Sequence, residues 1–394
     1  MFFERKVLRK IRHLLGRKGI IVVTGMRQVG KTTVLKMIFD EIQSKNKVFL
    51  DLENPILQKI FEEENYDNIW ANLKAYGMAS SEPAFIFLDE IQAMPAVVKA
   101  VKYLFDHYDA HFFLTGSSSF YLKNLFPESL AGRKIIFDLF PLDFEEFLLF
   151  KGEKKIFYEN FKDKEKNKNK ISHALVSKHF EEFINYGGFP KVALTEEIEG
   201  KKAVLEDIFK SYFEKEVRTL ADFKNVNVLR DFILLLMQRT GSKLNISNIS
   251  SEQGINRETA YSFLYFLELT YFLKLVPPFS RNKGTEVSGA KKVYFCDNGI
   301  LSHFAKISSG ALLENAVFNC IKTKGTINYY QKRSGREIDF ILKNESTALE
   351  VKENGSTHDI KKLSKQAEKL KLKEHYVITK NFTPEKGFIT ASDL

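Results

Sequence analysis

Residues 25–32 read Gly25-Met26-Arg27-Gln28-Val29-Gly30-Lys31-Thr32 and fit the pattern Gly-x-x-x-x-Gly-Lys-Thr. The apolar run Ile20-Ile21-Val22-Val23 precedes them and has the composition of a buried strand. In such a loop the glycines let backbone N–H groups turn inward toward a phosphate, and the following helix adds the positive end of its dipole. The order of strand, glycine-rich loop and helix start therefore predicts a nucleoside triphosphate site. The alternative is a glycine-rich turn that binds no ligand.

Each position of this loop has an expected role. Lys31 is expected to reach the β- and γ-phosphates, and the Thr32 hydroxyl is expected to ligate Mg²⁺. The backbone around them is expected to cradle the phosphates. The predicted nucleotide-binding residues of the loop are Gly25, Met26, Arg27, Gln28, Val29, Gly30, Lys31, Thr32 and Thr33.

A second apolar run, at residues 85–88, ends in the acids Asp89 and Glu90. Because open α/β sheets bind ligands at the carboxyl ends of their strands, we expect Asp89 at the Mg²⁺ held by Thr32. Glu90 is then expected beside the γ-phosphate, where it would orient or deprotonate the attacking water. The alternative is a strand whose acidic end simply faces solvent.

Two weaker signals follow a third predicted strand at residues 111–116. Ser117 stands at the end of this strand, where its hydroxyl is expected to sense a γ-phosphate, although a plain Gly-Ser turn is the alternative. Arg133 is a candidate arginine finger that acts in cis or across a subunit interface. A surface salt bridge is the other interpretation of Arg133.

Together these motifs resemble a prokaryotic family of AAA-type ATPases that carry a C-terminal domain of unknown function. The resemblance rests on the residues at 25–33, Leu-Asp-Glu-Ile-Gln at 88–92, Leu-Thr-Gly-Ser-Ser at 114–118 and Ala-Gly-Arg at 131–133. It continues through residues 140–147, 186–190 and 293–299, so it covers nearly the whole chain. The resemblance implies that ATP and Mg²⁺ are the cofactors, and that ATP is bound and hydrolysed.

The composition is that of a multidomain protein without a disulfide framework. Of the 394 residues, 44% are hydrophobic, which is enough for the cores of several domains. The two cysteines, Cys296 and Cys320, are far apart, no signal peptide is evident, and no run of about 18 apolar residues spans a membrane. These features predict a cytoplasmic protein. The net charge of +10 permits DNA or RNA as a partner, but a lysine-rich proteome would show the same excess.

Composition also predicts the domain boundaries. Alternating strands and helices predict a doubly wound parallel α/β domain over residues 1–150. Residues 151–172 are rich in Lys, Asp, Glu and Asn, and are predicted to form a charged, exposed linker or solvated helix ends. Residues 173–285 are predicted to be helical with a winged-helix-like part, and residues 286–394 to form a second α/β domain.

The winged-helix prediction rests on residues 244–276. A helix-turn-helix pattern is followed by the strand at 272–276, and Asn256 is expected to cap the second helix. That helix is apolar on almost every side over residues 260–269, whereas a DNA-reading helix needs a polar, basic face. We therefore expect a scaffold helix packed between domains. DNA contact through Arg257 and residues 281–283 is the alternative.

The last section holds a second group of chemically active residues. Glu350 and Lys352 are two positions apart and share one face of a predicted strand, while Asp339 on the preceding strand can pair beside them. Two carboxylates can hold Mg²⁺ or Mn²⁺, and Lys352 can activate a water that attacks a phosphodiester. Glu314, on a predicted helix, is the further candidate metal ligand. Asp339, Glu350 and Lys352 are therefore predicted catalytic residues beside Lys31 and Glu90.

This arrangement resembles the PD-(D/E)xK nucleases, which implies a restriction-endonuclease-like α/β domain. The predicted elements follow the same order: a helix at 312–321, strands at 327–330, 337–342 and 347–351, a helix at 359–370 and a strand at 376–378. An active nuclease, a nucleic-acid-binding or interaction module, and a structural remnant all remain open.

Two functions of different class follow from these alternatives. In the first, the ATP state controls the access of DNA or RNA to Asp339, Glu350 and Lys352. In the second, the chain is an ATP-switched interaction or nucleic-acid-binding module whose nuclease-like domain is inactive. The sequence leaves open whether the chain forms a homo-oligomer or binds a partner protein.

Overall fold

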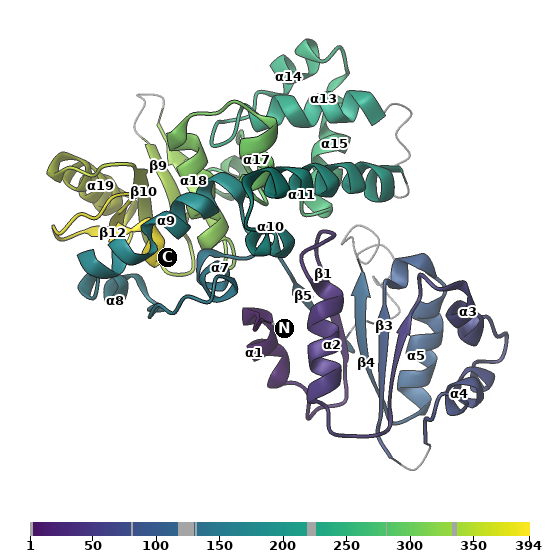
Figure 1. Cartoon of the computed structure of the whole chain (residues 1–394). Coiled ribbons are helices and arrows are strands. Elements are labelled where there is room, and N and C mark those ends of the chain that lie inside the picture. The colour runs from purple at the N-terminus through teal and green to yellow at the C-terminus, as the bar shows by residue number, and fades with distance from the viewer. Residues whose placement is uncertain are drawn as a thin grey trace. The chain divides into compact units, whose positions relative to one another are not determined.

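The computed structural model describes residues 3–79, 82–116, 130, 132–218, 226–280, 282–332 and 337–394 (Figure 1). The chain divides into two compact units, neither of which is continuous in sequence. Unit 1 consists of Met1–Phe140, Ser211–Asp222 and Leu269–Tyr271. Unit 2 consists of Pro141–Lys210, Phe223–Glu268 and Phe272–Leu394.

Unit 1 is built on a parallel sheet of five strands in the order β2-β3-β4-β1-β5. The strands are β1 (Ile20–Thr24), β2 (Lys47–Asp51), β3 (Ala84–Asp89), β4 (Ala110–Gly116) and β5 (Lys134–Asp138). The helices described around it are α1 (Lys6–Arg12), α2 (Lys31–Glu41), α3 (Pro55–Gln58), α4 (Tyr66–Lys74) and α5 (Val97–His107), with 3-10 turns at Lys59–Phe61 and Ile91–Ala93. The parallel sheet of the predicted α/β domain is thus confirmed.

The two faces of this sheet are buried by different helices. All five residues of β1 are buried, because alternate side chains face opposite layers. On one face, Ile20 and Val22 join a core that includes α4 and α5. On the other face, Phe39 of α2 packs against Phe87 of β3 with ring centroids 5.2 Å apart, and Phe87 stacks on Phe113 of β4 at 4.4 Å. The unit is therefore doubly wound.

Unit 2 combines a helical part with a second sheet. Its helices are α7 (Phe144–Phe150), α8 (Phe161–Lys166), α9 (Lys170–Tyr186), α10 (Pro190–Leu194), α11 (Ile198–Ser211), α13 (Val226–Met237), α14 (Ile246–Glu252), α15 (Arg257–Leu269), α16 (Lys283–Ser288), α17 (Asn298–Phe304), α18 (Ser309–Ile321) and α19 (Thr357–Leu370). A π-helical turn at Tyr212–Val217 follows α11. The boundary between the first two domains lies at residues 140/141 rather than at 150, because α7 packs within unit 2.

The large sheet of unit 2 has the order β12-β11-β10-β9-β8. Its strands are β8 (Ile327–Gln331), β9 (Glu337–Leu342), β10 (Thr347–Lys352), β11 (Glu374–Thr379) and β12 (Phe388–Thr390), and a 3-10 turn follows at Ala391–Asp393. β8, β9 and β10 pair antiparallel, whereas β10, β11 and β12 pair parallel. The predicted mixed α/β order is present, and its likeness to a restriction endonuclease stays a prediction.

Helices α18 and α19 cover this sheet from opposite sides. Phe340 of β9 packs near Phe318 of α18, and its partner in the ladder is Leu349. Ala348, one position earlier on β10, instead shares a core with Leu363 and Ala367 of α19. Because neighbouring residues of a strand point to opposite faces, Glu350 lies on the same face as Ala348, toward α19.

The predicted charged linker is wrong for its central part, which is an integral piece of unit 2. Phe161 and Lys164 of α8 are only 1% and 2% exposed. The ring of Phe161 stacks on Tyr376, and the Lys164 ammonium donates to the carbonyls of Asp393 and Leu394 at 2.6 and 2.9 Å. Composition misled the prediction because a lysine buries its stem and ammonium together when backbone carbonyls accept from it.

The region predicted to be winged-helix-like has α13, α14 and α15 followed by β6 (Leu273–Val276), which pairs antiparallel with β7 (Lys292–Phe295). Asn256 accepts a hydrogen bond from the Thr259 backbone, as a capping residue should. One side of α15 is buried through residues such as Phe263 and Leu267, while Tyr261 and Tyr265 are 59% and 61% exposed, and its role as a scaffold helix stays a prediction. The winged helix itself stays a prediction.

The glycine motifs at 186–190 and 297–299 meet around one buried carboxylate. Asp297, at 2% exposure, accepts hydrogen bonds from the backbone N–H groups of Gly188 at 2.6 Å, Gly299 at 2.8 Å and Ile300 at 3.1 Å. A Cβ atom on Gly188 would lie 2.1 Å from the Leu142 carbonyl oxygen. These motifs therefore serve packing within unit 2.

In the described part of the chain, no helix is long and apolar enough to cross a membrane.

Candidate nucleotide and carboxylate sites

The glycine-rich loop of unit 1 joins the carboxyl end of β1 to the start of α2 (Figure 1). Gly30, which precedes α2, has φ of 97°, a conformation that favours glycine. Gly25 has φ of 154°, and a Cβ atom there would lie 2.1 Å from the Leu139 carbonyl oxygen. A side chain larger than hydrogen therefore does not fit at Gly25. The loop backbone brings its N–H groups to the amino end of α2.

Lys31 is held inside this loop. Its ammonium donates to the carbonyls of Gly25 and Met26 at 3.1 and 2.8 Å, and the residue is 4% exposed. Burial lowers the pKa of Lys31, although the charges of Glu90 and Glu216 favour the protonated form. A phosphate that binds beside this buried ammonium would stabilise its positive charge through a charge-assisted hydrogen bond.

The predicted acids lie at the end of β3, two strands from β1. The strand between them, β4, carries Thr115, whose hydroxyl donates to the Asp89 carboxylate and accepts from the Glu90 backbone N–H at 3.0 Å. Burial raises the pKa of Asp89, while hydrogen bonds from Thr115 and Thr32 lower it. Thr32 is thus near Asp89. The Glu90 carboxylate accepts from the Gln92 amide, and its backbone has a left-handed φ of 53°.

Two further residues that contact this loop, Arg5 and Glu216, have no signal in the sequence. Arg5, 5% exposed, donates to the carbonyls of Val29 and Phe140 at 2.7 and 2.8 Å and so ties the loop to the end of β5. Arg27 of the loop pairs with Glu216 at 3.2 Å. These partners are far apart in the chain, so no spacing rule finds them, whereas Thr115 belonged to a quoted motif whose neighbour Ser117 was chosen instead.

The surroundings of Arg133 agree with its alternative interpretation, a surface salt bridge. Arg133 pairs with Asp106 at 2.8 Å on the surface of unit 1. Its carbonyl accepts from Ile20 at the start of β1, whereas the nucleotide loop follows the end of that strand. A five-residue strand separates the two by about 16 Å, and Arg133 is therefore at the wrong edge of the sheet for its own loop. Ser117 lies outside the described residues.

Magnesium fits the residues of unit 1 with a bound nucleotide. The Thr32 hydroxyl is near enough to the Asp89 carboxylate to lower its pKa, and Mg²⁺ takes oxygen ligands, commonly one or two from protein with the rest from phosphate and water. Over the whole described part of the chain, no group of three or more His, Cys, Asp or Glu side chains is placed to hold a metal ion.

The second candidate site lies in unit 2, where β9 and β10 pair antiparallel. Phe340 pairs with Leu349, and continuing this antiparallel register by one residue brings Asp339 beside Glu350. The Asp339 carboxylate accepts a hydrogen bond from the Val351 backbone N–H at 2.7 Å. The Lys352 ammonium donates to Glu350 at 2.9 Å. The predicted grouping of Asp339, Glu350 and Lys352 therefore appears in the described structure.

Glu314 has different partners from those the prediction gave it. Its carboxylate accepts from the Tyr294 hydroxyl at 2.5 Å and from the Lys292 ammonium at 3.2 Å, both on β7. Lys292 also pairs with Glu337 at 2.5 Å. The structure does not gather Glu314, Asp339 and Glu350 into one metal-binding group. Tyr294 was missed because the resemblance covered residues 293–299 as a motif without giving its side chains a role, and Lys292 lies just before that motif.

The acids of this cluster lie in an environment that disfavours their charge. Burial, followed by the neighbouring Asp339, raises the pKa of Glu314 and that of Glu350 to about 7 each. Burial also raises the pKa of Asp339, against the influence of Lys292. Carboxylates held this way take a proton or a cation readily, which makes the cluster a functional-site candidate.

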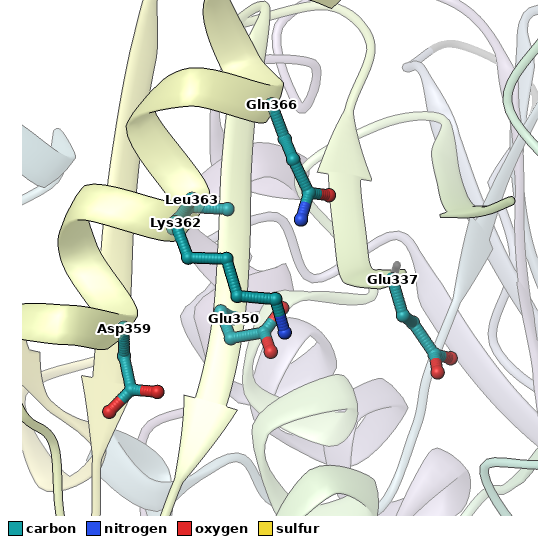
Figure 2. Close-up of a pocket in the computed structure, with 6 residues that line it drawn as sticks. All are labelled: Glu337, Glu350, Asp359, Lys362, Leu363 and Gln366. Atoms are coloured by element: carbon teal, nitrogen blue, oxygen red, sulfur yellow. The ribbon is translucent and has the colours of Figure 1, made fainter. Parts of the chain in front are cut away.

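A small pocket lies beside these acids (Figure 2). It is lined by Glu337, Glu350, Asp359, Lys362, Leu363 and Gln366. Figure 2 shows the Gln366 amide extending from α19 into the pocket. Gln366 is 7% exposed, and its amide oxygen has no hydrogen-bond partner among the described residues. A buried acceptor without a donor indicates that a ligand or water completes this pocket.

The fold and the site of unit 1 together define an AAA-type P-loop ATPase domain. A family model described as an AAA domain matches residues 17–148, and two domains of unknown function, DUF8612 and DUF4143, match residues 177–311 and 309–387. The chain belongs to the same family as the uncharacterized protein MJ1544 of Methanocaldococcus jannaschii, to which it is 30% identical over 90% of this chain and 80% of that protein.

Other relatives are similar over comparable lengths. An uncharacterized protein of Haemophilus influenzae is 28% identical over 91% of this chain and 87% of its own length. Among solved structures, the Walker-type ATPase PABY2304 of Pyrococcus abyssi matches with a TM-score of 0.48 and 13% identity, over 77% of this chain and 96% of that one. The Aeropyrum pernix ORC1 protein, solved in complex with DNA, matches with a TM-score of 0.35 and 12% identity, over 80% and 93%.

Proposed function

We propose that the chain binds ATP with Mg²⁺ and hydrolyses it in unit 1. The observation that carries the proposal is the loop between β1 and α2, in which the buried Lys31 ammonium contacts the Gly25 and Met26 carbonyls. In this proposal Lys31 and the loop N–H groups hold the β- and γ-phosphates, and Glu90 orients or deprotonates the attacking water. Thr32 and Asp89 would hold Mg²⁺, which supplies positive charge to the phosphates. Met26, Arg27, Gln28, Val29 and Thr33 contribute loop contacts.

Binding of a fluorescent ATP analogue to the full chain tests the first half of this proposal. Lys31→Ala removes a charge-assisted contact to phosphate, so we expect the affinity to fall more than about tenfold. Lys36→Ala is the matched control, because Lys36 is exposed on the same helix. Equal affinity in the two variants would exclude Lys31 from the nucleotide site.

For unit 2, we propose hydrolysis of DNA or RNA phosphodiesters that depends on Mg²⁺ or Mn²⁺. The support is the grouping of Asp339, Glu350 and Lys352 beside a pocket that holds an unsatisfied buried amide oxygen. Asp339 and Glu350 would hold the divalent ion, which supplies Lewis acidity. Lys352, 39% exposed at its side chain, is placed to contact a phosphate that enters from solvent.

The second candidate is an ATP-switched interaction or nucleic-acid-binding module without nuclease activity. The Lys292 ion pairs favour it, because they already neutralise part of the carboxylate charge. Two of the earlier predictions, action of Arg133 in trans within a homo-oligomer and a cytoplasmic location, remain predictions. The exposed Tyr261 and Tyr265 on α15 are available for a partner in either case.

Incubation of the purified chain with single- and double-stranded DNA and RNA separates these candidates. Mg²⁺ or Mn²⁺ is added with and without ATP, and Asp339→Ala and Lys352→Ala serve as controls. We expect cleavage that both substitutions abolish and that ATP changes. Binding with a steep salt dependence but without cleavage under any condition would establish the inactive module instead.

A further inference from the structure

Lys292 is the most enclosed charge of the unit 2 cluster. It is 3% exposed, and its ammonium lies 2.5 Å from Glu337, 3.2 Å from Glu314 and 4.0 Å from Asp339. The three acids come from α18 and β9, whereas Lys292 comes from β7. The lysine thus occupies the place among several carboxylates that a metal ion takes in a metalloprotein.

The surroundings of Lys292 stabilise its positive charge. Burial by itself lowers the pKa of Lys292, but Glu314, Asp339 and Glu337 outweigh it and hold that pKa above its ordinary value. The ammonium also lies 5.6 Å from the centre of the Tyr329 ring, within the range of a cation–π contact. Lys292 is therefore enclosed by groups that attract its positive charge.

Lys352 differs from Lys292 in each of these respects. Its side chain is 39% exposed, and it pairs with Glu350 alone among the ion pairs of the described residues. Lys352 can therefore turn toward a substrate, whereas Lys292 is enclosed by acids that would be left unpaired if it moved. The cluster thus contains one enclosed cation, Lys292, and one partly exposed cation, Lys352.

We infer that Lys292 fills one cation position of the carboxylate cluster, so that Glu314 and Glu337 bind the lysine and leave Asp339 and Glu350 to face any divalent ion. The binding of Lys292 by Glu314 and Glu337 concerns the chain alone. The binding of a divalent ion by Asp339 and Glu350 rests on the proposed nuclease function. This arrangement limits the cluster to a single divalent ion, and it explains why Glu314 stands apart from the predicted metal set.

Counting bound Mn²⁺ by electron paramagnetic resonance tests the inference on the full chain without nucleotide. We expect Lys292→Met to bind one more Mn²⁺ per chain than the wild type, because the substitution vacates a position between carboxylates. Lys243→Met is the matched control, since Lys243 is exposed and approaches the same Tyr329 ring at 5.7 Å. An equal number of ions in the wild type and Lys292→Met would overturn the inference.

A second pair of variants decides the matter if Lys292→Met does not fold. Glu314→Gln and Glu337→Gln each remove a partner of Lys292, and the inference requires the wild-type number of Mn²⁺ ions in both. Loss of an ion in either variant would make that acid a metal ligand and overturn the inference. The proposed nuclease is judged separately, because it requires that the wild type bind an ion that Asp339→Asn removes.

Discussion

Thr115 and Thr24 stand at the ends of neighbouring strands in unit 1 but have opposite surroundings. The Thr115 hydroxyl bridges the Asp89 carboxylate and the Glu90 backbone, and the residue is fully buried. The Thr24 hydroxyl is buried with no hydrogen-bond partner among the described residues. One hydroxyl therefore positions the acidic pair, while the other makes no bond within the described structure.

We expect Thr115→Val to lower the free energy of unfolding by about 1 to 3 kcal/mol, because Asp89 and the Glu90 N–H lose a buried partner. ATP turnover should fall as well, since both acids are positioned through this hydroxyl. Thr24→Val is the control and should not lower stability, because the Thr24 hydroxyl has no hydrogen bond to lose within the described structure. Urea denaturation and phosphate release measure the two effects. Similar results for both variants would refute the positioning role of Thr115.

Asp297 gives a pH-dependent prediction. Burial raises its pKa from 3.8 to about 6, although the N–H groups of Gly188, Ile300 and Gly299 donate to it. Between these two pH values the unfolded chain has released a proton that the folded chain keeps, so the folded state loses stability as the pH rises through this window. The loss is on the order of 2 to 3 kcal/mol.

Urea denaturation at about pH 4 and pH 7 measures this loss against an Asp297→Asn variant, which has no proton to release. The wild type should lose stability relative to the variant as the pH rises. A difference between the two proteins that is the same at both pH values would show that Asp297 keeps an ordinary pKa.

At the scale of elements, α8 shows how a helix rich in lysine is buried. Lys164 donates to two backbone carbonyls at the end of unit 2. We expect Lys164→Met to lower the free energy of unfolding by about 1 to 3 kcal/mol, since both carbonyls lose a donor. Lys162→Met, at an exposed position of the same helix, should change it by less than about 0.5 kcal/mol. Equal losses of stability in the two variants would support the exposed linker predicted from the sequence.

The elements also show what the sequence could and could not predict. The strand at 337–342 was predicted with the bounds that the structure has, because polar residues flank its apolar run in the sequence. The ATP loop was predictable because its chemistry lies in eight consecutive residues. Lys292 and Glu314 are 22 residues apart, and Arg27 and Glu216 are 189 apart, so only the folded chain reveals these pairs. Burial of α8 was missed because composition does not record backbone acceptors.

At the scale of the whole molecule, unit 1 depends on segments that follow residue 150 in the chain. Glu216 pairs with Arg27 of the ATP loop, and the Tyr212 hydroxyl bonds to Thr270 at 2.7 Å. Both partners of the second bond lie in the late segments, Ser211–Asp222 and Leu269–Tyr271. The first domain predicted from the sequence is therefore incomplete as a unit of structure.

A fragment of residues 1–150 should unfold at a temperature at least about 4 °C below the transition of unit 1 in the full chain, because it lacks these segments. It should also bind the fluorescent ATP analogue more weakly, since Arg27 loses Glu216. Differential scanning calorimetry and the binding titration check both points. A fragment with the stability and affinity of the full chain would show that the late segments are dispensable.

ATP hydrolysis at Glu90 is the central claim for the whole molecule. Single-turnover hydrolysis of γ-labelled ATP with Mg²⁺, by the wild type and by Glu90→Gln, tests it most directly. The account predicts that Glu90→Gln binds ATP with wild-type affinity and hydrolyses it at least about 100-fold more slowly. A wild-type rate in Glu90→Gln would contradict the account.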